Sequence, residues 1–133
     1  MDTPHFAVAV TAFVAALEGR IDGGITSFPD LFQHDAVIDV PFDGAGDPPP
    51  IVGRQAIENM AASLDGFVWF DEVTFHAVRG TDDPAVIVCE YEAVLRRADR
   101  EGPLRRRYIS VITIGERRIS HLREYGGPFM LTD

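Results

Sequence analysis

The sequence has 133 residues, which fits one globular domain, residues 1–133, without a linker or a second domain. Its composition, 46% hydrophobic and 25% charged, is ordinary for a soluble protein, and a net charge of −9 disfavours nucleic acids and acidic membranes as partners. The longest uncharged run, residues 6–17, is too short to cross a bilayer core of about 30 Å. No basic segment precedes this run, so we expect no signal peptide and a cytoplasmic location.

The N-terminal segment has the spacing of an amphipathic helix. Apolar side chains recur every three or four positions, at Phe6, Val10, Phe13, Val14 and Leu17. Asp2 or Thr3 can cap this helix, and Pro4 suits its first position. We therefore predict a first helix that begins at Pro4 and ends near Gly19.

The next segment is predicted to hold a short helix, a strand and an irregular loop. Residues 25–32 are read as a second helix, in which Pro29 is tolerated only because it lies in the first turn. Residues 36–42 are rich enough in β-branched side chains for a first strand. Residues 43–50, DGAGDPPP, cannot form regular structure and should be an exposed loop of fixed shape.

A third helix and four strands complete the predicted chain. Apolar residues at helical spacing place the helix between Gly53 and Gly66. Aromatic and β-branched residues then predict strands at residues 67–78, 86–97, 104–114 and 117–125. This order is typical of an α+β fold, with three N-terminal helices packed on a curved, mostly antiparallel sheet. A sheet folded over these helices would leave a conical cavity.

The last predicted strand carries the residue on which our functional interpretation depends. Residues 119–125 alternate between two faces, and Glu124 shares a face with Leu122 and Ser120. A carboxylate on the less polar face of a sheet is costly unless it is paired or protonated. We predict that Glu124 lies on the cavity wall, either as a general acid/base with a raised pKa or as a structural ion-pair partner of an arginine such as Arg106.

The same alternation predicts the other cavity residues. With the apolar faces of the hairpin strands on the concave side, the expected ligand-binding residues are Tyr91, Tyr108, Ser110, Leu122, Phe42, and Trp69 or Phe70. The two tyrosines and Ser110 can orient a ligand oxygen or can be core residues with satisfied hydroxyls, and Trp69 can also be a packing residue. His76 is a candidate proton partner of Glu124 if it faces the cone, and otherwise a structural histidine.

Other reactive or charged side chains have simpler explanations. Cys89 lies in an apolar run and is expected to be a buried thiol in a reducing compartment. The histidines show no metal-ligand spacing, so we predict no metal. The arginine-rich residues 96–107 are expected to pair with Glu90, Glu92 and Glu101 across the strands rather than to bind nucleic acid.

Three motifs occur in the first half of the chain. They are residues 31–37, LFQHDAV, leading into the predicted first strand, then Pro41 and Phe42 before the loop, and residues 52–57, VGRQAI, opening the third helix. With them, nearly the whole chain resembles the nuclear transport factor 2-like superfamily, in the branch with SnoaL-like polyketide cyclases and ketosteroid isomerases. The resemblance implies a cone-shaped domain, a homodimer built through the sheet, and a small hydrophobic substrate without a cofactor.

The ketosteroid isomerases resemble this chain without sharing its polar residues. By this resemblance, their helix-one tyrosine falls on Ala16 and their catalytic base falls on Val40. Their protonated oxyanion-hole aspartate corresponds to Ser110. Steroid isomerisation is therefore not expected.

The phenazine-biosynthesis A/B-type proteins of the same superfamily are more similar. The shared features are residues 68–69, VW, before a strand, residues 81–84, TDDP, in a turn, and residues 123–125, REY, with a proline following. In that group the glutamate of the Arg-Glu-aromatic motif lies in the pocket and acts in acid/base chemistry. The resemblance implies this role for Glu124.

Two functions follow as hypotheses. The first is a cofactor-free enzyme of cyclase, isomerase, dehydratase or condensation type, in which Glu124 moves a proton of a small hydrophobic or aromatic substrate. The second is a non-catalytic module that binds a small hydrophobic ligand or only dimerises. An open apolar pocket with an unpaired Glu124 favours the enzyme, whereas a closed or water-filled cone with a salt-bridged Glu124 favours the module.

Overall fold

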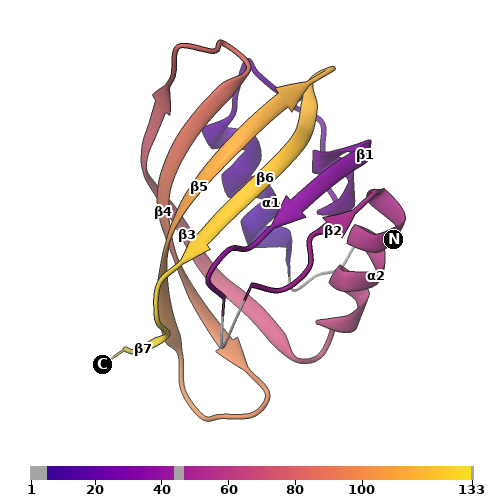
Figure 1. The fold of residues 1–133 in the computed structure, drawn as a ribbon. Helices are drawn as coiled ribbons and strands as arrows, with labels where there is room; N and C mark the ends of the chain where they lie inside the picture. Colours follow the sequence, from indigo (N-terminus) through magenta and orange to yellow (C-terminus); the bar gives the residue numbers. More distant parts are fainter. Residues whose placement is uncertain (1–5, 44–46, 133) are drawn as a thin grey trace.

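A curved sheet with two helices against it makes up the computed structural model, which describes residues 6–43 and 47–132 (Figure 1). The helices are α1 (Ala7–Ala16) and α2 (Arg54–Ser63), with the 3-10 turn η2 (Pro29–Leu31) between them. The strands are β1 (Phe32–Asp39), β2 (Ile51–Val52), β3 (Val68–Gly80), β4 (Val86–Arg97), β5 (Leu104–Gly115), β6 (Arg118–Gly126) and β7 (Met130–Leu131). The predicted capping residues Asp2, Thr3 and Pro4, and residues 44–46 of the predicted loop, lie outside the described residues.

The sheet has the strand order β2-β1-β6-β5-β4-β3, and β7 pairs with the start of β5. The pairing of β1 with β6 is parallel, and the other described pairings are antiparallel. In Figure 1, α1 lies in the hollow formed by the long strands, whereas α2 lies beside β1 and β2. The sheet therefore has a concave face that the helices cover and a convex outer face.

The predicted alternation of β4 is confirmed. Every second residue of its central part is buried, namely Ile87, Cys89, Tyr91, Ala93 and Leu95. Burial raises the pKa of the Cys89 thiol to about 11, which keeps it protonated and unreactive at neutral pH. Glu90, between two of these residues, is exposed and pairs with Arg79 of β3 at 3.5 Å. The concave side of the hairpin is thus apolar and the convex side is charged.

The three predicted helices are not confirmed, because residues 25–32 contain only the single turn η2. Pro29 has no backbone N–H to donate, and the chain is already extended at Phe32, with φ −110° and ψ 147°. Phe32 pairs with Ile119 of β6 and is completely buried, as is Leu31. Burial of these side chains against the sheet outweighs the helical pattern, so β1 begins four residues earlier than predicted.

Charged side chains on the convex face form a network around Glu92. Its carboxylate lies 2.6 Å from His76 of β3 and 3.2 Å from Arg105 of β5. The His76 hydrogen bond lowers the pKa of the Glu92 carboxyl. Arg96 and Arg97 pair instead with aspartates, at 2.9 Å and 2.6 Å. The arginine-rich stretch is therefore largely neutralised within the chain, although mostly by aspartates rather than by the predicted glutamates.

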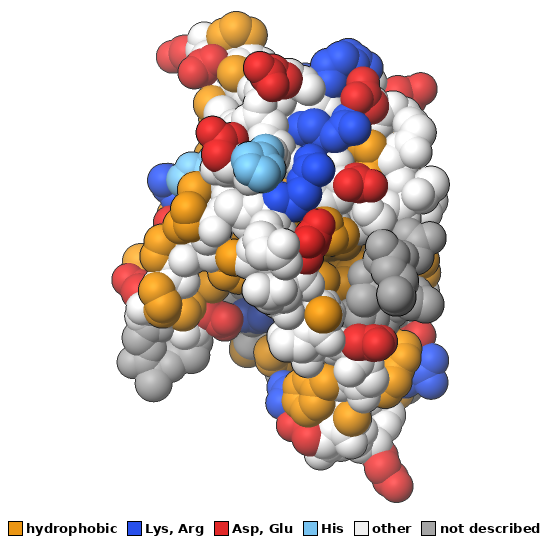
Figure 2. All heavy atoms as spheres, turned by 90° about the vertical axis from the view of Figure 1, so that its right-hand side faces the viewer, with side chains coloured by type: hydrophobic (Ala, Val, Ile, Leu, Met, Phe, Trp, Pro, Cys, Tyr) orange, Lys and Arg blue, Asp and Glu red, His pale blue; other side chains and the backbone are white. Residues whose placement is uncertain are grey.

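Figure 2 shows the side of the molecule at the right of Figure 1. Arginine side chains gather in the upper part of this face, and acidic side chains lie around them. Hydrophobic side chains are scattered between these charges.

Neither described helix has the length and apolarity required to span a bilayer.

Candidate functional site

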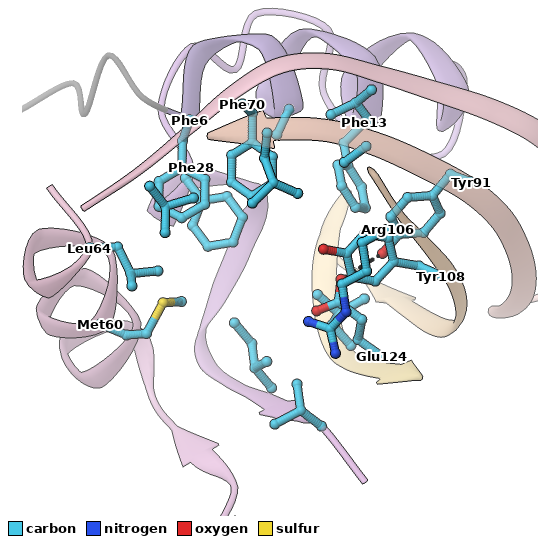
Figure 3. A pocket seen from close by; sticks show the side chains of 18 of the residues that line it. Phe6, Phe13, Phe28, Met60, Leu64, Phe70, Tyr91, Arg106, Tyr108 and Glu124 are labelled. Atoms are coloured by element: carbon cyan, nitrogen blue, oxygen red, sulfur yellow. Dashed lines mark hydrogen bonds between the residues drawn. The ribbon is translucent and has the colours of Figure 1, made fainter. Parts of the chain in front are cut away.

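A cavity of about 360 Å³ lies between the two helices and the concave face of the sheet. Its wall is mostly apolar and draws on several elements, as Figure 3 shows with Phe6, Phe13, Phe28, Phe70, Met60 and Leu64. Ligand pockets commonly have volumes of about 300–1,000 Å³, mostly apolar walls and a few polar groups. The cavity therefore suits a small ligand of one or two rings.

Glu124 of β6 places a carboxylate in this apolar wall (Figure 3). It lies on the same face as Leu122 and opposite Ser110 of β5. Burial raises the pKa of the Glu124 carboxyl, because apolar surroundings disfavour the charged form, while a hydrogen bond from Tyr91 and the charge of Arg106 oppose the shift. The alternative ion pair with Arg106 is not formed: Arg106 pairs with Asp43 instead, at 3.1 Å.

Tyr91 forms a hydrogen bond with the Glu124 carboxylate, and Ser110 in turn forms one with Tyr91. The Tyr91 hydroxyl donates to Glu124 Oε1 at 3.0 Å and lies 2.7 Å from Ser110 Oγ. Because the single phenolic proton points to Glu124, the Ser110 hydroxyl must donate to the Tyr91 oxygen. Burial also raises the pKa of Tyr91 well above its usual value, so that the phenol remains a donor. These two hydrogen bonds fix Glu124 Oε1, whereas no hydrogen bond within the described residues engages Glu124 Oε2.

Tyr108 extends the aromatic wall next to Tyr91. The two rings stack with centroids 5.1 Å apart and an interplanar angle of 19°, and Phe75 stacks on the other face of Tyr91 at 4.7 Å. Burial raises the pKa of the Tyr108 hydroxyl, so it too stays protonated at neutral pH. Tyr108 therefore offers the cavity a flat ring and one hydroxyl donor.

Of the predicted ligand-binding residues, Tyr91, Tyr108 and Leu122 line the cavity, as does the predicted catalytic residue Glu124. Phe70, the alternative to Trp69, also lines it. Ser110 lies behind the wall: it is completely buried and bonds to Tyr91.

Besides Ser110, three predicted residues do not line the cavity. Phe42 is 77% exposed, because a turn with a φ of 61° at this residue directs its ring outwards. The centroid of the Phe42 ring lies 6.1 Å from that of Tyr125. Trp69 is 41% exposed, since its neighbour Phe70 takes the inward position. His76 pairs with Glu92 on the convex face and cannot exchange protons with Glu124.

The position of His76 follows from two register shifts in β3. His76 is itself the extra residue between Phe75, opposite Tyr91, and Ala77, opposite Glu90, and an earlier β-bulge has already changed the inward face of the strand. The register moves from Phe70 opposite Leu95 to Glu72 opposite Val94, so Asp71 is an extra residue. Before the bulge the even-numbered Phe70 points inwards, and after it the odd-numbered Val73 and Phe75 do. The strand pattern alone does not reveal this change of face.

Several lining residues were not predicted. Phe6, Phe13 and Phe28 come from the N-terminal region, where helical spacing predicts a buried face but does not distinguish a packed core from a cavity wall. Val40 also lines the cavity, at the position that the resemblance assigns to the base of ketosteroid isomerases. That position is inside the cavity here but has no titratable group.

No site for a metal ion is apparent in the part of the chain that the structure describes. Within residues 6–43 and 47–132, no three His, Cys, Asp or Glu side chains converge as metal ligands would. The polar side chains that line the cavity are instead two carboxyls, two phenols and two guanidinium groups, from Asp43, Glu124, Tyr91, Tyr108, Arg97 and Arg106. Hydrogen bonding and proton transfer are the chemistry that this set provides.

Comparison with known proteins gives relatives at low sequence identity. No protein-family model matches the chain. The uncharacterized protein YesE of Bacillus subtilis (strain 168) is 24% identical over 113 residues, which are 85% of this chain and 77% of that protein.

Solved structures give a clearer likeness. An isomerase candidate from Bacillus subtilis has a TM-score of 0.71 at 24% identity and covers 96% of this chain and 91% of its own. An LEH-like epoxide hydrolase of Mycobacterium tuberculosis has a TM-score of 0.60 at 22% identity, and the match covers 94% of this chain and 84% of the hydrolase. A phenazine biosynthesis-related protein of Pseudomonas aeruginosa has a TM-score of 0.58 at 19% identity, and the match covers 74% of this chain and 66% of that protein. The chain thus has the same fold as these proteins, the nuclear transport factor 2-like fold that its sequence motifs predicted.

Proposed function

We propose that the protein is a cofactor-free acid/base enzyme of the SnoaL-like kind, which acts on a small hydrophobic or aromatic molecule. The supporting observation is Glu124, a carboxyl group in an apolar cavity, held through one oxygen and without an ion-pair partner in the described residues. A carboxyl group whose pKa is raised towards the working pH is suited to general acid/base catalysis. Neighbours of the same fold named as an epoxide hydrolase and an isomerase candidate support an enzyme rather than a binding module.

The proposed chemistry is proton transfer at a carbon next to a carbonyl group. Glu124 Oε2 takes the proton, and the electrons of the broken C–H bond move to the carbonyl oxygen. The Tyr108 hydroxyl is the candidate donor to this oxygen, because its raised pKa keeps its proton in place. Glu124 then returns the proton to the same or another carbon, which gives exchange or isomerisation. Ring closure of the cyclase type begins from the same carbanion.

Hydrogen exchange at a simple ketone tests this proposal without knowledge of the natural substrate. We expect the protein to accelerate the exchange of the α-hydrogens of 2-tetralone in D₂O, measured by mass spectrometry. The variant Glu124→Gln should reduce this acceleration by about 10²–10⁴-fold, the usual contribution of one acid/base group. The matched control is Glu90→Gln, a carboxyl on the convex face. Undiminished exchange in Glu124→Gln would contradict the role of Glu124, and no exchange in the wild type would favour the binding module.

The same assay tests the positioning role of Tyr91. The hydrogen bond from Tyr91 stabilises the ionised form of Glu124 and so lowers its pKa. The variant Tyr91→Phe should therefore shift the rising limb of the pH profile to higher pH. A lower rate with an unchanged pH profile would indicate that Tyr91 only packs in the wall.

A further inference from the structure

Arg106 of β5 lines the same cavity, on the same strand face as Tyr108. Only 15% of its side chain is exposed. The guanidinium carbon lies 4.5 Å from the Phe129 ring centroid and 5.2 Å from that of Tyr108, and Nε donates to the backbone oxygen of Gly127 at 2.8 Å. These contacts fix the orientation of the guanidinium and remove it from most of the solvent.

Gly126 provides the space in which this guanidinium lies. A Cβ atom at residue 126 would lie 2.4 Å from Arg106 Nη2 and 2.5 Å from its Cζ, far closer than any real contact. Gly126 does not have a positive φ, so its backbone alone does not require glycine. The glycine is therefore explained by the arginine. It also lies two residues after Glu124 on β6, which separates the two positions by about 7 Å along the strand.

The present counter-ion of Arg106 is held weakly. Asp43 accepts one hydrogen bond from Nη2, at 3.1 Å, and 47% of its side chain is exposed. Such a single, solvated ion pair contributes little and exchanges readily. Arg97, which also lines the cavity, differs because both oxygens of Asp99 hold it, at 3.0 Å and 2.6 Å. Arg106 is therefore the guanidinium whose carboxylate partner is the easier to replace.

We propose that Arg106 recognises a carboxylate group of the ligand, which displaces Asp43, and that the cavity takes small aromatic or alicyclic carboxylic acids. Guanidinium groups favour carboxylates because the two can form parallel hydrogen bonds, and a partly desolvated site strengthens them. The apolar body of the acid would occupy the aromatic part of the cavity, with its reacting carbon towards Glu124. This inference rests on the proposed function, since it names the class of molecule on which Glu124 acts.

Calorimetric titration with a matched pair of probes, 2-naphthoate and the neutral 2-naphthamide, tests the inference. We expect the wild type to bind the acid at least tenfold more tightly than the amide. Arg106→Gln should abolish this preference while the affinity for the amide changes less than threefold. Gly126→Ala should weaken the preference without removing any charge. The control Arg107→Gln, the next residue on β5 but on the convex face, should behave like the wild type.

Asp43→Asn separates an exchangeable counter-ion from a structural one. If the ligand carboxylate replaces Asp43, this variant binds 2-naphthoate several-fold more tightly and binds 2-naphthamide as before. Weaker binding of both probes in Asp43→Asn would overturn the inference. So would a wild type that does not bind 2-naphthoate, or that binds the acid and the amide with equal affinity. A preference for the acid that is preserved in Arg106→Gln would overturn it as well. Naphthoate binding does not require proton transfer, so the affinities are measured independently of the hydrogen-exchange assay. The inference and the proposed catalysis can therefore fail separately.

Discussion

Glu124 occupies a position where its charged form is disfavoured, and this has a consequence for stability. Burial raises the pKa of the carboxyl above the 4.5 usual for glutamate. Between the unfolded and the folded pKa values, the folded state binds more protons than the unfolded state does. Stability therefore falls as the pH rises through this range, and the full cost is present above the folded pKa.

The variant Glu124→Gln should remove this cost. Glutamine keeps the shape and the acceptor for Tyr91 but carries no charge, so we expect Glu124→Gln to be more stable than the wild type at pH 7. Each pKa unit of elevation corresponds to about 1.4 kcal/mol. Below about pH 4.5 the carboxyl is protonated in both states, and the gain should disappear. Urea unfolding at pH 4 and pH 7 measures the difference, with Glu90→Gln as the exposed control. Equal or lower stability of Glu124→Gln at pH 7 would show that the carboxylate is well stabilised where it lies.

The sequence contained the signal for Glu124 and suggested Arg106 only as its ion-pair partner, but it did not show that the Arg106 guanidinium lies over Gly126. Alternation along one strand was sufficient to place Glu124 with Leu122 on the apolar face. The fit of the guanidinium over Gly126 depends on the register between β5 and β6, where Tyr108 lies opposite Gly126. Register is a property of two strands, and Gly126 by itself indicated only the end of a strand.

Helix α1 is held mainly by its packing against the sheet. Within the described residues, which begin at Phe6, no side-chain hydrogen bond to the N-terminus of α1 is seen, and the first turn has no acidic residue. Phe13, which is 6% exposed, packs edge-on against Phe75 at 5.1 Å and against Tyr91 at 5.5 Å. The helix and the aromatic wall of the cavity thus depend on the same contact.

We expect Phe13→Ala to lower the free energy of unfolding by about 3–5 kcal/mol, the usual cost of removing a buried phenylalanine. The control Val8→Ala, on the same helix but 38% exposed, should change it by less than about 0.5 kcal/mol. Urea unfolding followed by circular dichroism compares the two. A loss below about 1 kcal/mol for Phe13→Ala would mean that other contacts fix α1.

Element prediction succeeded where a pattern was long and bounded by turns. The predicted residues 86–97 coincide with β4, and β3, β5 and β6 differ from the prediction by one or two residues at their ends. The two-residue strands β2 and β7 have no period to detect, because only their pairing with β1 and β5 defines them. The second helix was wrong because the burial of Phe32 against β6 decided the backbone there.

Neither described helix covers the convex face of the sheet (Figure 1). Most of its charges are paired within the chain, and Ile109 lies between Glu90 of β4 and Tyr125 of β6 with 49% of its surface exposed. Protein interfaces commonly have an apolar centre surrounded by polar groups, and an exposed isoleucine among paired charges has this arrangement. We propose that two copies of the chain associate through this face, as the family resemblance implies.

Light scattering after size-exclusion chromatography tests this association. We expect the wild type to have about twice the 14.7 kDa mass of one chain. Ile109→Arg places an unpaired charge at the centre of the contact, and its desolvation should shift the equilibrium to the monomer. The control Val52→Arg, at the far edge of the sheet and 63% exposed, should leave the mass unchanged. A monomeric wild type, or a dimeric Ile109→Arg, would contradict the arrangement. Because the cavity lies on the concave side of the sheet and Ile109 on the convex side, the monomeric variant should still bind 2-naphthoate with wild-type affinity. Loss of the dimer and loss of the site are therefore measured independently.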